Sequence, residues 1–523
     1  MKLLSHRPFS SSSFGRGERC MVIILSSYFL LTLSRSEVQQ GHPQLQHFTP
    51  PSTVQFLGVF TRSSSAASVG ASLAVDDINA HNVRTNLPFR VNLVEETGVG
   101  GGGETHCGAM EDPVTLMSRL LSAAMSSASP PFTPITTKPI ILAGCHSDCV
   151  LLAQAESDAI TMCYGLRSSV TRMDDVTTSE MFMMQPDLCT LIIPLTKLVL
   201  QFGWRKVAVI SFGGDPLGYL AELVGSVLEE HGVRVGRLDG RASFGLVQQR
   251  NFRIVVVVGG EVMGREILCA IYKAAMFNNY VWIFIGPSGK EWVVQGEHGA
   301  IPGSCRVDQL VAAAEGHLVL SPMMWHPNPN LRTVSNRTAA SFRREVVRRL
   351  GGQLRMMDFD EAPLAYDAVW AAYIGVASSL LECGGTTCPI QMDDSLNGVM
   401  FPGVSGNVSF RDGRRSVTGV TLRVEQFKNG RYEEVAFHFN GNNSWSWVRQ
   451  SIFGSEVPGD GFDVGDTFFP DIPFPPSLTP PEPPERSSAN TPLAPPARFG
   501  IATFFYPLSI ISQHYILYCI IST

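Results

Sequence analysis

The stretch DFDEAPLAYDAVWAAYIGVASSLL (residues 358–381) is predicted to form a long helix late in the chain. Asp360 is a suitable N-cap, Pro363 fits the first turn, and nothing interrupts the run before Cys383. One face repeats at the helical period of 3.6 residues and is formed by Val369, Ala372, Val376 and Leu380. Such a face predicts a helix packed against a core.

The same stretch also carries polar and aromatic side chains that a buried stripe does not explain. Glu361 opens the helix, where an acid complements the positive end of the helix dipole, and this is its simplest explanation. A second row of aromatic residues is predicted to belong to the core and consists of Tyr366, Trp370 and Tyr373. Any further role of Glu361 depends on the rest of the chain.

Upstream of this helix, between about residues 50 and 330, short β-rich runs alternate with helical runs. The expected strands are VQFLGVF (54–60), FRVNLVE (89–95), PIILAG (139–144), AITMC (159–163), KVAVISF (206–212), FRIVVVV (252–258) and VWIFI (281–285). The expected helices include 68–80, 114–127, 195–204, 220–232 and 263–277. This alternation predicts parallel sheets covered by helices on both faces. A break near 190–205 divides the units into two α/β groups.

Downstream of the helix the pattern changes. Residues 406–439 indicate antiparallel hairpins, with turns at Asp412-Gly413 and Asn429-Gly430. Residues 455–498 are Pro-rich and predict an extended stalk. The apolar tail, residues 499–523, is long enough to cross a membrane but is interrupted by polar residues and a proline. It is therefore either a truncated transmembrane segment or a wrongly joined terminus.

The start of the chain indicates export. Three arginines precede the apolar run MVIILSSYFLLTL (21–33), which predicts a signal peptide over residues 1–36, with an uncleaved signal anchor as the alternative. Glycosylation sequons occur at Asn336, Asn407 and Asn442. Together they predict an oxidising, extracellular location.

Several classes of function find no support. The net charge of -6 and the lack of a long basic run give no reason to expect a nucleic-acid partner. The chain has no GxSxG, HExxH or P-loop pattern, so we expect no enzyme. Cys145 and Cys149 lack a second pair at metal-ligand spacing, so we expect no metal and no cofactor.

Several long blocks, in order, resemble one family. They are GWRKVAVI (203–210), ILCAIYKAAMFNNYVWIFIG (267–286), AAEGHLVL (313–320), VSNRTAASF (334–342), DEAPLAYDAVWAAY (360–373) and VSGNVSF (404–410). Over about residues 50–450 the chain resembles the extracellular domain of GABA-B receptors, metabotropic members of the class C G-protein-coupled family. The resemblance implies a bilobed venus-flytrap of the type I periplasmic-binding-protein fold, with two Rossmann-like lobes joined by a three-stranded hinge. Lobe 1 is expected at about 50–195 plus 335–390, and lobe 2 at about 196–334 plus 391–450.

Ligands of open α/β sheets bind beyond the carboxyl ends of the strands, near helix N-termini. The strand at 139–144 runs into His146 and Ser147, where backbone N–H groups and a hydroxyl suit a carboxylate; a plain helix cap is the alternative. The next strand end brings Arg167 and Ser168 beside them, although an arginine more often extends to solvent. The resemblance implies that Glu361 binds the amine of the ligand.

The chain departs from GABA-binding subunits at several cleft positions. It has Gln185 where they carry a histidine, Gly260 in place of a tyrosine, and Pro287 in place of a tryptophan. Their first-lobe glycine-tryptophan loop has no counterpart in TRSSSAAS (61–68). These changes predict another amino acid or related small ligand, or a partner subunit that binds none.

The resemblance also implies disulfides and partners. Cys107 is expected to pair with Cys145, and Cys269 with Cys305. We expect a homodimer or a heterodimer with a related receptor subunit, on the extracellular side of the plasma membrane, and a G protein only if a seven-helix domain follows. The alternatives are a secreted soluble binding protein or decoy, and the ectodomain of a receptor guanylate cyclase. The sequence that follows residue 498 in the gene would separate them.

Overall fold

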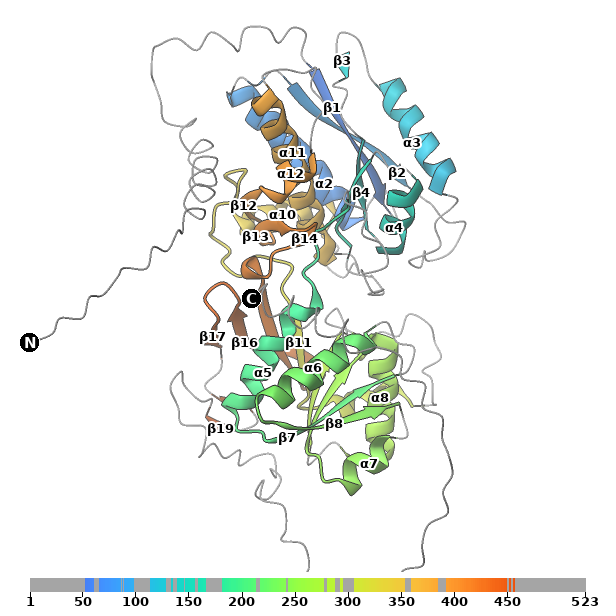
Figure 1. The fold of residues 1–523 in the computed structure, drawn as a ribbon, viewed down its shortest axis with the longest axis vertical. Helices are drawn as coiled ribbons and strands as arrows, with labels where there is room; N and C mark the ends of the chain where they lie inside the picture. Colours follow the sequence, from blue (N-terminus) through green and yellow to red (C-terminus); the bar gives the residue numbers. More distant parts are fainter. Residues whose placement is uncertain are drawn as a thin grey trace, which may run out of the picture.

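The computed structural model describes residues 52–60, 65–85, 87, 89–97, 113–127, 133–134, 139–144, 146–155, 159–165, 181–212, 217–240, 243–276, 280–286, 292–294, 305–352, 359–383, 392–448, 451–452 and 455–456. These residues form two lobes, one above the other in Figure 1, and each lobe is built on one large sheet covered by helices. The expected signal peptide and tail, and nearly all of the Pro-rich segment, lie outside the described residues. Among the described helices, none combines the length and the apolar composition that a membrane crossing needs.

The first lobe contains a nine-stranded sheet in the order β12-β13-β14-β6-β5-β4-β1-β2, with β3 beside β1. Its strands are β1 (Ser52–Phe60), β2 (Phe89–Thr97), β3 (Thr133–Pro134), β4 (Ile140–Ala143), β5 (Ile160–Cys163), β6 (Met181–Met183), β12 (Met400–Gly403), β13 (Gly406–Arg411) and β14 (Arg414–Arg415). The strands from β2 to β6 are parallel, and β12 to β14 are joined by antiparallel pairing. Parallel strands buried on both faces require apolar runs such as Ile140–Ala143, which is fully buried.

Helices cover this sheet on both sides (Figure 1). They are α2 (Ala66–Thr85), α3 (Pro113–Ser127), α4 (His146–Ala155), α10 (Ala339–Arg349), η3 (Phe359–Glu361), α11 (Ala362–Cys383) and α12 (Met392–Asn397). Helix α11 packs along α2 in the core of the lobe. The structure therefore contains the predicted late helix, with Pro363 in its first turn.

Helix α11 is buried on more than the one predicted face. The side chains from Ala362 to Tyr373 are all buried, because α2, the sheet and α12 surround them. The aromatic row lies in the core as predicted, and two of its hydroxyls donate hydrogen bonds to α2. Tyr366 donates to Asp77 at 2.7 Å, and Tyr373 donates to Asn82. A hydroxyl buried in a core needs such a partner, so these tyrosines attach α11 to α2.

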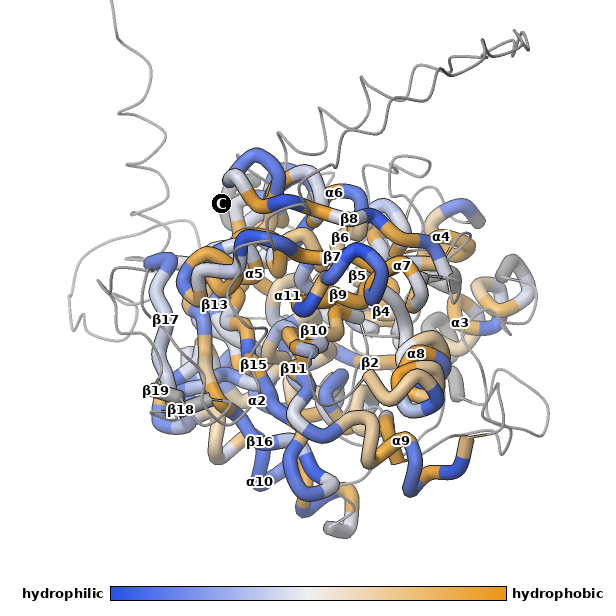
Figure 2. The backbone as a smooth tube through the Cα atoms, turned by 90° about the horizontal axis from the view of Figure 1, so that it is seen from below, coloured by the Kyte–Doolittle hydropathy of each residue, from blue (hydrophilic) through white to orange (hydrophobic). Residues whose placement is uncertain are grey.

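The second lobe contains an eight-stranded sheet in the order β17-β16-β15-β11-β10-β9-β7-β8. Its strands are β7 (Lys206–Ser211), β8 (Arg234–Asp239), β9 (Ile254–Val258), β10 (Val281–Ile285), β11 (Leu318–Pro322), β15 (Thr421–Lys428), β16 (Arg431–Phe439) and β17 (Ser444–Trp447). Its helices are η2 (Leu188–Leu191), α5 (Ile192–Gln201), α6 (Gly218–Glu230), α7 (Ser243–Gln249), α8 (Glu261–Lys273) and α9 (Val307–Ala314). In Figure 2, part of β16 and the polar helix α10 of the first lobe are coloured blue and lie at the periphery. A short hairpin of β18 (Ser451–Ile452) and β19 (Ser455–Glu456) follows.

The chain passes between the lobes three times. The interlobe segments are residues 184–187 after β6, residues 323–338 after β11, and residues 416–420 after β14, where η4 (Val417–Gly419) lies. Because β6 and β11 leave their sheets toward the other lobe, the carboxyl ends of the parallel strands in both sheets face one another. This arrangement is the bilobed venus-flytrap fold with its three-stranded hinge.

Two features of the sheets differ from the sequence-based expectation. Residues 391–450 were assigned to lobe 2, but β12, β13 and β14 are hydrogen-bonded to the first sheet, where Arg414 of β14 aligns with Met183 of β6. The chain then joins the second sheet only at β15. Strands β6, β8 and β11 were also not predicted, because β6 is short and β8 is an edge strand that alternates charged and apolar residues.

The core of the second lobe contains a histidine. The ring of His317, which is 2% exposed, stacks on Phe427 with 5.5 Å between ring centroids. Its Nδ1–H donates to the carbonyl oxygen of Ala314, so Nε2 accepts from the Tyr432 hydroxyl at 2.7 Å. Burial lowers the pKa of His317 to about 3, and the neutral ring is the folded form.

We predict that this histidine destabilises the protein in mild acid. In the unfolded chain His317 takes up a proton near pH 6.5, whereas the folded ring stays neutral down to a pH of about 3. The free energy of unfolding is therefore not reduced by this residue above pH 6.5, and it decreases as the pH falls below that value. Between pH 7.5 and pH 5 the loss is about 2 kcal/mol. Urea unfolding at the two pH values measures it.

The variant His317→Phe should have a free energy of unfolding that changes less between these pH values, even though it is less stable at pH 7.5. As a control, His231→Gln changes an exposed histidine at the end of α6 and should keep the wild-type pH dependence. An unchanged pH dependence in His317→Phe would contradict the prediction.

Candidate functional site

The carboxyl ends of β1, β4 and β5 form the edge of the first sheet that faces the second lobe. Val59, Ala143 and Cys163 lie side by side there in register. Helix α4 begins at His146, directly beyond β4, so its N-terminus lies at this edge as the sequence predicts. The structure describes the backbone of His146 and Ser147 but not their side chains. Arg167 and Ser168 lie outside the described residues. Their proposed contacts with a ligand therefore remain predictions.

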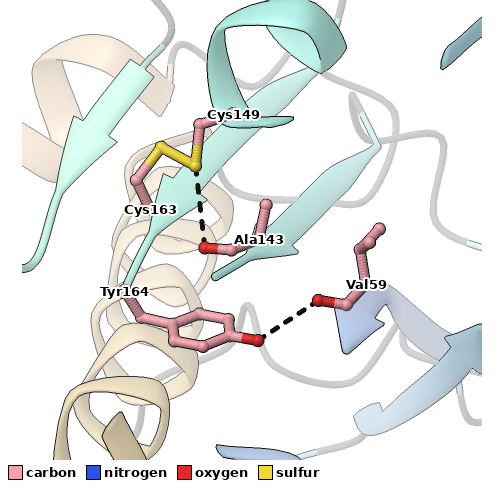
Figure 3. The surroundings of a disulfide bond; sticks show 5 residues. All are labelled: Val59, Ala143, Cys149, Cys163 and Tyr164. Atoms are coloured by element: carbon pink, nitrogen blue, oxygen red, sulfur yellow. Dashed lines mark hydrogen bonds between the residues drawn. A yellow bond between two sulfur atoms is a disulfide. The ribbon is translucent and has the colours of Figure 1, made fainter. Parts of the chain in front are cut away.

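Tyr164 packs against this edge, and no pattern in the sequence indicated such a role. Its hydroxyl donates to the carbonyl oxygen of Val59 at 3.2 Å, across the intervening strand β4 (Figure 3). The ring is 1% exposed and lies 5.9 Å from that of Phe60. Next to it, a Cβ at Gly165 would lie 1.0 Å from the carbonyl oxygen of Gly144, so no side chain fits between these strand ends. The edge is thus closely packed by backbone and one tyrosine.

Disulfides hold both lobes. Cys149 on α4 is joined to Cys163 at the end of β5, with 6.0 Å between Cα atoms, and its Sγ lies 3.6 Å from the carbonyl oxygen of Ala143 (Figure 3). This bond fixes the first turn of α4 to the sheet edge. The sequence left these two cysteines unassigned. In the second lobe Cys269 is joined to Cys305 with 5.6 Å between Cα atoms, which is the pair that the resemblance implies. Cys107 and Cys145 lie outside the described residues.

Glu361 is half-buried at the end of η3, directly before α11. The start of α11 lies against the start of α2, since a Cβ at Gly70 would be 2.3 Å from the carbonyl oxygen of Ala362. Helix α2 itself begins just after the carboxyl end of β1. This contact brings Glu361 to the same end of the lobe as the strand ends described above.

Aromatic side chains fix the turn that carries Glu361. The predicted N-cap Asp360 accepts a hydrogen bond from Trp325 Nε1 at 2.6 Å, so its carboxylate contacts an interlobe segment. The indole of Trp325 stacks on Phe359 with 4.9 Å between ring centroids, and Arg343 lies over both rings. Glu361 is therefore presented on a turn with little freedom to move.

In the described part of the chain, glycines follow two strands at the facing edge of the second lobe. Gly260 is the N-cap of α8, directly beyond β9, and nothing in the described part of the chain lies within 4 Å of a Cβ built there. Gly286 follows β10, and Pro287 lies outside the described residues. Gln185 is half-buried in the first interlobe segment. The structure thus leaves open space where GABA-binding subunits are expected to carry a tyrosine.

A separate pocket of about 790 Å³ lies at the opposite end of the first lobe. It is lined by the end of α2, the start of β2 and the second interlobe segment, through residues that include Arg84, Arg90 and Arg337. Asp77 already pairs with Arg337 at 2.6 Å. No group of acidic, histidine and cysteine side chains suited to a metal ion occurs among the described residues.

Comparison with known proteins agrees with this geometry. Residues 67–429 match the family described as the receptor family ligand binding region. The chain is 28% identical over 362 residues to mouse gamma-aminobutyric acid type B receptor subunit 1. The aligned region covers 63% of this chain and 36% of that protein. It is 24% identical over 292 residues to rat subunit 2, which covers 51% of this chain and 30% of that protein. The chain thus matches about a third of the length of these relatives.

The fold also matches solved structures. An ABC transporter substrate-binding protein from Desulfitobacterium hafniense, in complex with Leu, superimposes with a TM-score of 0.51 and 14% identity over 73% of this chain and 100% of that one. At this identity the match speaks for the fold alone. The family match covers most of the chain and describes a ligand-binding region rather than an enzyme. The chain therefore belongs to the family of receptor ligand-binding regions, and it is a GABA-B-like member of that family.

Proposed function

We propose that this chain is the extracellular ligand-binding region of a GABA-B-like metabotropic receptor, and that it senses an amino acid or similar small molecule by closure of its two lobes. The observation that carries the proposal is the position of Glu361, on a fixed turn at the end of the first lobe where the strand ends and the N-terminus of α4 lie. A carboxylate and a helix N-terminus at one edge suit the two charged ends of an amino acid.

Lobe closure is the expected response because a ligand between two sheet edges makes its full set of contacts only when the edges approach. The three interlobe segments are the places where the backbone can absorb that movement. Signalling through a G protein requires a seven-helix domain in the same receptor. The match to both subunit 1 and subunit 2 of gamma-aminobutyric acid type B receptors favours a heterodimer with a related chain.

A partner subunit that binds no ligand is the second candidate function. It is favoured by the open space at Gly260 and by the glycines that end β9 and β10. Without side chains there, the second lobe contributes fewer contacts on closure, and the free energy gained by closure is smaller. A secreted decoy and a receptor guanylate cyclase ectodomain would use the same fold, and the sequence that follows residue 498 in the gene distinguishes them.

We predict that Glu361→Gln abolishes amino-acid binding and leaves the fold nearly unchanged. A first-turn acid contributes only about 0.3–1 kcal/mol to stability, whereas truncating one partner of a desolvated charge pair costs about 2–5 kcal/mol of binding. Calorimetric titration with a panel of amino acids that includes GABA identifies a binder, and the variant is then titrated with that compound. Thermal unfolding measures the stability of both proteins.

The control variant is Glu230→Gln, which removes an exposed acid at the end of α6 in the second lobe. It should bind like the wild type. If Glu361→Gln changes the dissociation constant by less than about threefold, which is about 0.7 kcal/mol, Glu361 is only a helix-start acid. If no compound of the panel binds the wild type, the partner-subunit function replaces the leading one, and co-purification with a related receptor chain tests it.

We also predict glycosylation at Asn336, Asn407 and Asn442. All three side chains are exposed, and Asn336 and Asn442 lie in turns between elements. Expression in a secretory eukaryotic host followed by enzymatic deglycosylation should lower the mass, and each single Asn→Gln variant should lose part of that shift. A protein of unmodified mass that stays in the cytosol would contradict both the glycosylation and the extracellular location.

A further inference from the structure

One buried turn, residues 403–406 between β12 and β13, is linked to two of the interlobe segments and lies beside Arg415, after which the third begins. The turn lies directly on a carboxylate, because a Cβ at Gly403 would be 2.3 Å from Oδ2 of Asp367 on α11. Asp367, which is fully buried, accepts hydrogen bonds from the backbone N–H of Val404 at 2.9 Å and of Ser405 at 2.8 Å, and from the Ser405 hydroxyl. Asp367 therefore attaches this turn to the helix that follows Glu361.

A buried arginine connects the same turn to two other strands. Arg415, at the end of β14, donates from Nη2 to the carbonyl oxygens of Ser405 and Asn407, both at 3.2 Å. Its Nη1 donates to the carbonyl oxygen of Met184 at 3.3 Å. Met184 begins the first interlobe segment, and the third segment begins directly after Arg415. One guanidinium thus joins the turn to the first and third segments.

Backbone hydrogen bonds add the second segment. His326 donates from its N–H to the carbonyl oxygen of Val404 at 2.8 Å, and Val334 donates to Pro402 at the same distance. Met323 donates to the carbonyl oxygen of Thr421, the first residue of β15 directly after the third segment, also at 2.8 Å. The second segment is therefore hydrogen-bonded to the turn that Asp367 holds and to the first residue of β15, and the first segment is linked to that turn through Arg415.

Stability alone is a poor explanation for this arrangement. Burial raises the pKa of Asp367 to about 6 and lowers that of Arg415 to about 10, which means that both charges are costly to keep in the interior. Arg415 Nε also has no acceptor in the described part of the chain. Buried ion networks of this kind are often neutral or unfavourable compared with well-packed apolar side chains. An apolar core could match the stability of this network, but it would not reproduce the directional hydrogen bonds of Asp367 and Arg415.

We propose that Asp367 and Arg415 are positioning residues that hold the three interlobe segments in a fixed relation to α11 and thereby set the angle between the lobes. They lie on opposite sides of Ser405, whose N–H and hydroxyl contact the acid and whose carbonyl contacts the arginine. Asp367 and Glu361 are within about two turns of one another at the start of α11. Through this short, rigid piece of helix, a contact made at Glu361 reaches the segments that must bend on closure, so the inference deepens the proposed function.

The test separates positioning from stability with a charge-neutral double variant of the full chain. Asp367→Asn alone leaves Arg415 buried without its counter-charge and should lower the melting temperature. Asp367→Asn/Arg415→Met removes both charges and should recover most of that loss, but it cannot restore the bonds from Arg415 to Met184, Ser405 and Asn407. Arg237→Met, which breaks the contacts of Arg237 with Glu222 and Glu229 inside the second lobe, is the control.

Hydrogen exchange followed by mass spectrometry reports the position of the segments without any ligand. In the double variant, peptides that contain Met323, His326 and Val334 should exchange about tenfold faster or more, while those of β9 remain protected. X-ray scattering should give a larger radius of gyration. The control should change neither readout. If faster exchange is confined to Val404 and Ser405, or if melting temperature and exchange recover together, the two residues serve only local stability.

Binding measurements keep this inference apart from the proposed function. With the amino acid found by titration, the double variant should bind about tenfold more weakly or worse, although Glu361 is intact. If Glu361→Gln abolishes binding while the double variant exchanges and binds like the wild type, the proposed function stands and the positioning role is wrong. If the double variant shows the exchange change and no amino acid binds either protein, the positioning role stands and the ligand assignment fails.

Discussion

The close contact between α2 and α11 is the constraint on which the first lobe depends. The backbone of Ala362 approaches Gly70 so closely that any side chain at that position would collide with it. Tyr366 and Tyr373 then extend the contact along the helices through hydrogen bonds to Asp77 and Asn82. Because α2 starts at the carboxyl end of β1, this packing determines where Glu361 lies relative to the sheet. A change in the angle between the two helices would move the acid away from the strand ends.

Much of this fold can be predicted from the sequence, for physical reasons. The strands β7, β9 and β10 contain continuous apolar runs, which parallel sheets covered on both faces require. Two of the strands that escaped prediction lack that signal: β8 alternates charged and apolar residues at an edge, and β6 has three residues. β12 to β14 join the first lobe through the pairing of Arg414 with Met183 and through core side chains such as Phe401 and Phe410. No local pattern encodes a pairing between residues so far apart.

The candidate site divides in the same way. Glu361 and the start of α4 could be proposed from the sequence because helix starts and strand ends leave a local trace, and because the surrounding blocks resemble a family. Tyr164 has no such local signal, since a tyrosine after a strand is ordinary in sequence. Its role is visible only from the hydrogen bond of its hydroxyl to Val59. The Cys149–Cys163 bond depends on α4 folding back onto β5, which the spacing of the cysteines does not reveal. No local pattern indicates the complete burial of Asp367, which becomes visible only with the turn at 403–406 in place.

The two facing edges differ in how firmly they are held and in the side chains that they carry. The first edge is fixed by a disulfide, by Tyr164 and by the aromatic stack under Glu361. The second edge ends in glycines after β9 and β10, with open space at Gly260. A ligand held as proposed would therefore take most of its orientation from the first lobe, since a preorganised set of contacts loses less entropy on binding. The described glycines after β9 and β10 would add affinity through their backbone groups and through exclusion of water. Because the described residues after β9 and β10 offer backbone groups there, selectivity among amino acids would then depend in part on the length that fits between the two edges.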